Sequence, residues 1–241
     1  MNERNRPRYT WLGHATVRCD LPGGEVVLID PFITGNPSYP KSAGDPERVD
    51  LILITHAHAD HLGDAARLAK QHGALVIASF EITTFLGSQG AAKTSGMNLG
   101  GAQRALGLEI TMVRADHSSS YEHEGRVIYG GLACGYVVRW DDDFAFYHAG
   151  DTALFSDMAM IGDLYRPELA FLPIGDHYTM DPEQAARACR YLNCRWVIPI
   201  HWGTFPVLSG KPDALRRALT HHGCSTEVVA LQPGESWAAV D

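Results

Sequence analysis

The 241-residue sequence predicts an α/β fold, because short apolar runs alternate along it with segments of helical pattern. An apolar run of four to six residues is typical of a buried strand, and the helical segments between such runs are typical of crossover connections. One helix has strong start signals, with Asp181 as N-cap, Pro182 at its first position and Gln184 at its third. The alternating segments are the strand 51–54, the helix 63–70, the strand 74–78, the strand 168–173, the helix 182–192 and the strand 195–200.

The remaining segments complete this pattern. Two strands, 9–19 and 25–30, are expected to form an opening hairpin around a Leu-Pro-Gly-Gly turn, and the proline-rich stretch 33–46 is expected to be a long loop. The acidic turn Asp141–Asp143 is predicted to join two strands and to be solvated. The further elements expected are the helix 80–88, the strand 108–113, the strands 131–140 and 144–148, the helix 212–222 and the strand 227–231.

The composition fits a single domain over residues 1–241, since 45% of the residues are hydrophobic and 20% are charged. The net charge of −8 argues against general binding to nucleic acid or to a membrane surface. Residues 1–8 are basic but are followed by no long apolar segment, so we expect no secretory signal, no membrane span and a cytoplasmic location. The five cysteines include no C-x-x-C pair, which fits reduced thiols.

A dense cluster of metal-binding side chains follows the apolar run 51–54. It consists of three histidines and one aspartate, namely His56, His58, Asp60 and His61. The preceding strand anchors their backbone, and His56 and His58 project to the same side of an extended chain. The other two follow where the chain turns into a helix, so the cluster is able to face two adjacent metals. Imidazole and carboxylate without thiolate suit zinc, manganese or iron at a site that keeps a position open for water.

Three more candidate ligands stand just past the ends of predicted strands, where open α/β folds gather functional groups. They are His117, Asp151 and His201. Three serines, 118–120, follow the first of them, and they either orient ligands or substrate or simply cap the loop.

Other polar residues near strand ends are assigned different roles. A lone histidine in a strand is usually a hydrogen-bonded core residue, so we expect His14 not to bind metal. Asp30 ends a strand and is a candidate to hold a ligand histidine in one tautomer. His148 is expected to point away from the ligands. His177, in the loop after strand 168–173, is a hypothetical catalytic group on its position alone.

The segment 56–61 completes the pattern His-x-His-x-Asp-His, and through it the sequence resembles the metallo-β-lactamase superfamily. The resemblance implies a four-layer αββα sandwich with a one- or two-metal site at the edge of its two sheets. It assigns three histidines to the first metal and three side chains to the second, with one bridging aspartate. In this order the implied ligands are His56, His58 and His117, then Asp60, His61 and His201, then Asp151.

Several shorter segments resemble a small UPF0173-like group of metal-dependent hydrolases related to ascorbate-6-phosphate lactonase. These segments are 13–15, 30–32, 117–120, 150–152, 173–175 with 179–180, and 201–206. Other branches of the superfamily fit less well. A flavodiiron-type site would have glutamate at the position of His58. An RNA-processing relative would normally carry a large inserted domain, for which 241 residues leave no room.

The mechanism that this resemblance implies uses two divalent cations, with zinc or manganese preferred and iron as a further option. Together they lower the pKa of a shared water, so that a metal-bound hydroxide is available as nucleophile at neutral pH. Asp60 and Asp151 would hold and orient the hydroxide. The second metal or His177 would assist the leaving oxygen.

The sequence therefore predicts a metal-dependent hydrolase of a small lactone or phosphoester. Cleavage of cyclic nucleotides or other phosphodiesters stays open, because lactones and phosphodiesters present similar anionic transition states to the same two cations. The alternative of another class is a metal-binding protein without catalytic activity. A small-molecule substrate is the expected partner, nucleic acid and membranes are not, and a homo-oligomer is left open.

Overall fold

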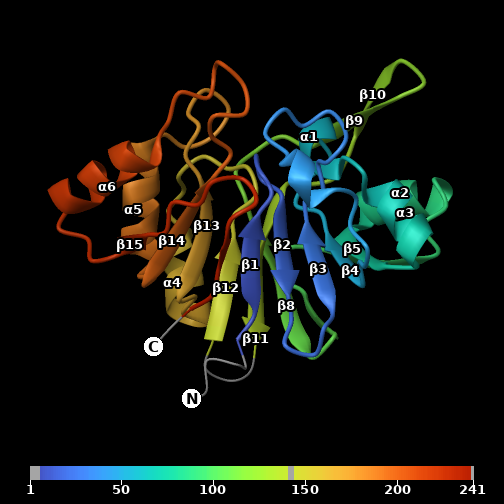
Figure 1. Ribbon diagram of the computed structural model, residues 1–241, viewed down its shortest axis with the longest axis horizontal. Coiled ribbons are helices and arrows are strands. Elements are labelled where there is room, and N and C mark those ends of the chain that lie inside the picture. The colour runs from blue at the N-terminus through green and yellow to red at the C-terminus, as the bar shows by residue number, and fades with distance from the viewer. Residues whose placement is uncertain (1–5, 141–143, 240–241) are drawn as a thin grey trace. The chain divides into compact units, whose positions relative to one another are not determined.

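The computed structural model describes residues 6–140 and 144–239, which divide into two compact units (Figure 1). Each unit is built from segments that are separate in the sequence. The first comprises Met1–Met97, Ser119–Gly131 and Leu231–Asp241, and the second comprises Asn98–Ser118 and Leu132–Ala230. Within the described residues no helix is both long and apolar enough to cross a membrane. That residues 1–241 form a single domain stays a prediction.

The first unit contains a mixed seven-stranded sheet in the order β16-β1-β2-β3-β4-β5-β6. Strands β3 to β6 are parallel, and the others pair antiparallel. The strands are β1 (Arg8–Trp11), β2 (Val17–Asp20), β3 (Val26–Ile29), β4 (Leu51–Leu53), β5 (Leu75–Ser79), β6 (Lys93–Met97) and β16 (Ser236–Trp237). The helices are η2 (Lys41–Ala43), α1 (Ala59–Leu62), α2 (Ala65–His72) and α3 (Phe80–Ser88).

A two-stranded ribbon, β9 (Ser120–His123) and β10 (Arg126–Tyr129), also belongs to the first unit and extends away from its sheet (Figure 1). The sequence patterns did not predict this ribbon. An isolated two-stranded ribbon is at best marginally stable in water, so its attachment to the unit matters. Its base is fixed by Gly130, whose N–H donates to the Ser119 carbonyl at 3.0 Å, and by the Ser79 hydroxyl, which donates to the Gly130 carbonyl at 3.2 Å.

The core of the first unit forms where strands β3, β4 and β5 pack against α2 and α3. Leu28, Ile52 and Val76 come from the strands, and Leu68 and Ile82 come from the helices. All five side chains are fully buried. Each such side chain contributes about 1.5–3 kcal/mol by leaving water, so this core fixes the strand ends from which the metal motif emerges.

The predicted strand 9–19 is wrong as a single element, because it is two antiparallel strands, β1 and β2. Trp11 pairs with Val17, so the chain reverses over the five residues between them. Gly13 and His14 have φ angles of 89° and 55°, and such left-handed backbone ends a strand. His14 therefore lies in a tight turn and not inside a strand.

The second unit contains a mixed sheet in the order β15-β14-β13-β12-β11-β8-β7, with β12 to β15 parallel. As predicted, Asp181 caps α5, its carboxylate accepting the Gln184 N–H at 2.7 Å. The turn Asp141–Asp143, which was predicted to be solvated, lies outside the described residues. The sequence did not predict the helix α4 (Met158–Tyr165). The strands are β7 (Ala102–Ala105), β8 (Leu108–Arg114), β11 (Cys134–Trp140), β12 (Phe144–His148), β13 (Leu169–Pro173), β14 (Trp196–Ile200) and β15 (Glu227–Val228). The helices are α4 (Met158–Tyr165), α5 (Pro182–Leu192) and α6 (Pro212–His221).

A buried carboxylate, Asp64, holds the long loop 33–46 of the first unit against the start of α2. It accepts hydrogen bonds from the backbone N–H of Ile33 and Thr34 at 3.0 and 2.7 Å, and from the Thr34 hydroxyl at 2.7 Å. The Arg67 guanidinium donates to it at 2.9 Å. Burial acts to raise the pKa of Asp64, but the hydrogen bonds from Thr34, Arg67 and Ile33 outweigh it, so the pKa is lowered.

Replacing Asp64 by asparagine removes the charge that these donors stabilise. We expect the free energy of unfolding at pH 7, measured by urea denaturation, to fall by about 1–3 kcal/mol. Because the folded-state pKa is lowered from its ordinary value of 3.8, this loss is fully present above that value and disappears as the pH falls through the folded-state pKa. The matched control is Asp213→Asn, since the Asp213 side chain is 77% exposed in its pair with Arg216 and should change stability by less than about 0.5 kcal/mol. Equal effects of the two substitutions would contradict the anchoring role.

Candidate metal centre

The first histidine pair of the motif lies at the carboxyl end of β4. His56 Nε2 and His58 Nδ1 are 3.0 Å apart, and the Thr55 hydroxyl lies 3.1 Å from His56 Nδ1. Two nitrogens bound to one tetrahedral zinc at 2.0–2.1 Å would be separated by about 3.3 Å. The spacing of these two nitrogens therefore fits a shared divalent cation, with His56 presenting Nε2 and His58 presenting Nδ1.

Asp30, at the end of β3, fixes the third histidine of the motif. Its carboxylate accepts hydrogen bonds from the Thr55 N–H at 2.8 Å and from the Thr55 hydroxyl at 2.6 Å, and it lies 2.8 Å from His61 Nδ1. Asp30 and His61 are both fully buried. A carboxylate on Nδ1 selects the tautomer that presents Nε2, which confirms the prediction that Asp30 holds a candidate ligand histidine.

His14 contacts the motif aspartate. Its Nε2 lies 2.9 Å from Asp60 Oδ2, and the His14 side chain is fully buried. The expectation that His14 is a buried, hydrogen-bonded residue is confirmed, but the sequence did not indicate its partner. The two residues are 46 positions apart, and no local pattern reports a contact at that distance.

Ser119 holds the backbone of the motif from the ribbon side of the first unit. Its Oγ accepts the Ala57 N–H at 3.1 Å and donates to the Gly130 carbonyl at 3.2 Å. A Cβ on Gly130 would lie 2.3 Å from the Ala57 Cβ, so only glycine permits this approach. Of the two roles considered for the serines, Ser119 thus has the structural one, because it caps backbone groups.

The second unit gathers the other three candidate ligands. Asp151 follows β12, His201 follows β14 and His117 stands three residues past β8. Asp151 Oδ2 lies 3.0 Å from His201 Nε2 and 3.7 Å from His117 Nε2. One carboxylate oxygen near two imidazole nitrogens is the arrangement expected of donors to one or two cations.

Short-range contacts hold these three residues together. The Thr152 hydroxyl accepts the Asp116 N–H at 2.9 Å, and the Ala153 N–H donates to the Asp116 carbonyl at 3.1 Å, so the segments that carry His117 and Asp151 are joined. Gly175 passes against the loop after β14, where an added Cβ would lie 2.1 Å from the His201 carbonyl oxygen. Neither Thr152 nor Asp116 was singled out from the sequence.

Two other histidines of the second unit lie apart from this group of contacts. His148 is buried at the end of β12, where its Nδ1 accepts the Gly150 N–H at 3.2 Å and its ring stacks on Phe171. His148 is therefore a core residue, which the sequence had not predicted. His177 is exposed in the loop after β13, and its ring packs edge-to-face on Tyr178 with centroids 4.4 Å apart. Its catalytic role stays a prediction.

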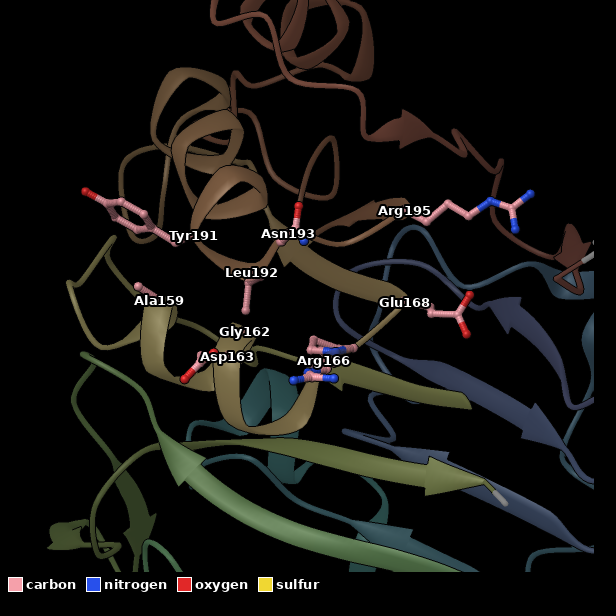
Figure 2. A pocket seen from close by; sticks show the side chains of 10 residues that line it. Ala159, Gly162, Asp163, Arg166, Glu168, Tyr191, Leu192, Asn193 and Arg195 are labelled. Carbon is pink, nitrogen blue, oxygen red and sulfur yellow. The ribbon is translucent and has the colours of Figure 1, made fainter. Parts of the chain in front are cut away.

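A hollow of about 450 Å³ in the second unit lies elsewhere (Figure 2). It is bounded by α4, by the end of α5 and by the residues that precede β13 and β14, among them Glu168 and Arg195. These residues stand at the amino ends of parallel strands, whereas Asp151 and His201 follow carboxyl ends. This hollow is therefore not part of the candidate metal centre.

Both units thus present histidine and aspartate donors just past the ends of strands, and all of these strands except β8 belong to the parallel parts of the sheets. Together with the mixed sheets, these donors define a metal-binding α/β protein of the kind that carries out metal-assisted hydrolysis. The chain belongs to the beta-lactamase superfamily, since the pattern of the Beta-lactamase superfamily domain matches residues 25–202.

Similar proteins narrow this assignment. A UPF0173 metal-dependent hydrolase of Solibacter usitatus is 53% identical over 94% of this chain and 97% of its own length, and one of Koribacter versatilis is 47% identical over 96% and 97%. The solved structure of Igni18, a metallo hydrolase from Ignicoccus hospitalis, is 36% identical, covers 98% of this chain and 99% of its own, and has a TM-score of 0.85. The predicted metallo-β-lactamase fold and metal-dependent hydrolase activity are confirmed. The ligand set, the identity of the metals and the likeness to ascorbate-6-phosphate lactonase stay predictions.

The substitution Asp30→Asn tests the orientation of His61. It removes an anionic acceptor from Nδ1, so we expect metal affinity, measured by competition with a chelator, to fall about 10- to 100-fold. The matched control is Asp50→Asn. The Asp50 carboxylate also accepts a backbone N–H in this sheet, that of Val26 at 2.8 Å. Asp50 lies at the amino ends of β3 and β4, whereas Asp30 lies at their carboxyl ends. A folded Asp30→Asn protein with unchanged metal affinity would show that this contact does not position a ligand.

Proposed function

We propose that the protein holds two divalent cations, zinc or manganese in preference to iron, and that it hydrolyses a small lactone or phosphoester. The proposal assigns three ligands to each cation and one aspartate to both. The ligands are His56, His58 and His117 for the first, Asp60, His61 and His201 for the second, and Asp151 for both. Membership of the superfamily and the complete His-x-His-x-Asp-His pattern support this assignment.

One observation carries the proposal, namely that other groups engage the Nδ1 atoms of two motif histidines. Thr55 lies against Nδ1 of His56, and Asp30 lies against Nδ1 of His61. In both rings Nδ1 is engaged in this way, so Nε2 is the candidate ligand atom of each. A motif used only for packing would not need two imidazoles oriented by separate partners.

The chain's own groups then have distinct tasks. Bound cations would polarise the attacked group and make water reactive at neutral pH. Asp60 and Asp151 would hold and orient the attacking water, and one of the two carboxylates would accept the proton that it loses. His14, 2.9 Å from Asp60 Oδ2, would keep the Asp60 carboxylate from rotating. His177 would protonate the leaving oxygen from its exposed loop.

The reaction class is tested with one metal-reconstituted preparation and two substrates, a five-membered lactone and bis(p-nitrophenyl) phosphate. We expect Asp60→Ala to lower kcat/KM by at least about 100-fold on the true substrate class, because it removes both a ligand and a water-orienting group. Asp163→Asn, at an exposed site on α4, is the control and should leave the rates unchanged. If the wild-type rate clearly exceeds the rate of Asp60→Ala with only one of the two substrates, that substrate identifies the reaction class. Equal rates for the wild-type protein and the blank on both substrates, with metal fully bound, would refute the proposal.

The role of His177 is tested by varying the leaving group. A general acid matters most when the leaving group is a poor one, so His177→Ala should slow a substrate with an alkoxide leaving group about 10- to 100-fold and a p-nitrophenyl substrate far less. Metal content should not change, and His221→Ala, at an exposed histidine of α6, is the control. If His177→Ala hydrolyses each of the two substrates as fast as the wild-type protein does, His177 has no part in the mechanism.

A further inference from the structure

A cavity of about 310 Å³ lies in the first unit, directly beside the metal motif. It opens between α1, α2 and α3 on one side and the ribbon β9–β10 on the other. Its main lining residues are Ala57, Ala59, Leu62, Ala66, Phe85 and Tyr121. We call this cavity the apolar side pocket. Its volume is at the lower end of the range of about 300–1,000 Å³ that small-molecule sites occupy.

The walls of the apolar side pocket suit an uncharged group. Phe85 and Tyr121 stack with ring centroids 4.1 Å apart and form an aromatic wall, while alanine side chains leave the opposite side open. Polar character comes from Gln89 and Glu122. Among the described residues that line the pocket there is no lysine, arginine or histidine, so a phosphate would meet an acidic group without a cation to balance it.

The pocket and the candidate ligands share one short stretch of backbone. Ala57 and Ala59 alternate with His56, His58 and Asp60 along the chain, and successive Cα atoms are about 3.8 Å apart. Ala57 lies between His56 and His58, and Ala59 begins helix α1 beside Asp60. The pocket is lined by the two alanines and by none of the candidate ligands, so it flanks the ligands and is not the place where the bond would break. Ala59 is exposed and His58 is partly so, which makes this edge the route from the pocket to the ligands.

We propose that the apolar side pocket binds an uncharged apolar substituent of the substrate, an aliphatic chain or an aromatic ring, while the hydrolysable group lies at the metal ligands. This inference rests on the proposed hydrolytic function and specifies its substrate class. The substrate then carries a hydrophobic side chain, as an alkyl-substituted lactone does. Substrates whose substituents are charged or strongly hydrated, such as phosphorylated sugars, are disfavoured, because those substituents would have to leave water for an apolar wall.

The substrate preference is tested with two five-membered lactones, one unsubstituted and one with a six-carbon side chain. Burial of a methylene group is worth about a factor of four in binding, so the wild-type kcat/KM should favour the substituted lactone by at least about tenfold. Ala66→Phe fills the pocket from α2 and should reduce this preference to about one. Ala159→Phe is the matched control, since Ala159 is an exposed helix residue that lines the separate hollow of the second unit, and it should keep the preference (Figure 2).

A binding measurement separates the pocket from the reaction. The uncharged fluorophore N-phenyl-1-naphthylamine is titrated into the metal-loaded full-length proteins, and Ala66→Phe should bind it at least about tenfold more weakly than wild type or Ala159→Phe. Loss of both the chain preference and fluorophore binding in Ala66→Phe supports the inference. Equal fluorophore affinity in all three proteins, or an active Ala66→Phe enzyme with the wild-type chain preference, overturns it. If no lactone is hydrolysed but Ala66→Phe alone fails to bind the fluorophore, the lactonase function fails, and with it the substrate assignment, while the pocket stands as a binding site.

Discussion

The arrangement of the metal-binding edge in the first unit depends on the buried carboxylate of Asp30. Burying a charge costs several kcal/mol unless hydrogen bonds compensate it, and here Thr55 supplies two donors and His61 Nδ1 lies at the same carboxylate. The Asp30 N–H also donates to the Leu53 carbonyl at 3.0 Å. The end of β3 is therefore tied to the end of β4, and the orientation of His61 follows from the same contacts that fix the register of the sheet.

The second unit positions its donors with uncharged contacts. The Thr152 hydroxyl bonds to the Asp116 N–H, and the close approach at Gly175 sets the path of the chain beside His201. In both units most of the donors follow parallel strands, and helices connect β4 to β5, β12 to β13 and β13 to β14, so that the carboxyl ends of these strands meet at one edge of each sheet. His117 is the exception, because it follows β8, which pairs antiparallel with β7 and β11.

The sequence predicted most elements because periodicity and capping are local signals. The helices at Phe80–Ser88 and Pro182–Leu192 begin and end as predicted, since Asp181 and Pro182 determine where the second one starts. The first strand was misjudged because the left-handed turn at residues 13–14 carries an ordinary apolar pattern. The sequence did not predict the ribbon β9–β10, because polar and apolar residues do not alternate regularly along its two strands. Contacts such as His14 with Asp60 depend on tertiary register, which single-sequence patterns do not contain.

The motif itself separates two tasks that a hydrolase must combine. Its histidines and aspartate are the candidate metal ligands, whereas the intervening Ala57 and Ala59 line the apolar side pocket. The Ala57 Cβ already excludes any side chain at Gly130, so a larger residue at position 57 would push the ribbon outward and reshape the pocket. The proposed function thus assigns metal binding and substrate selection to neighbouring residues of one segment.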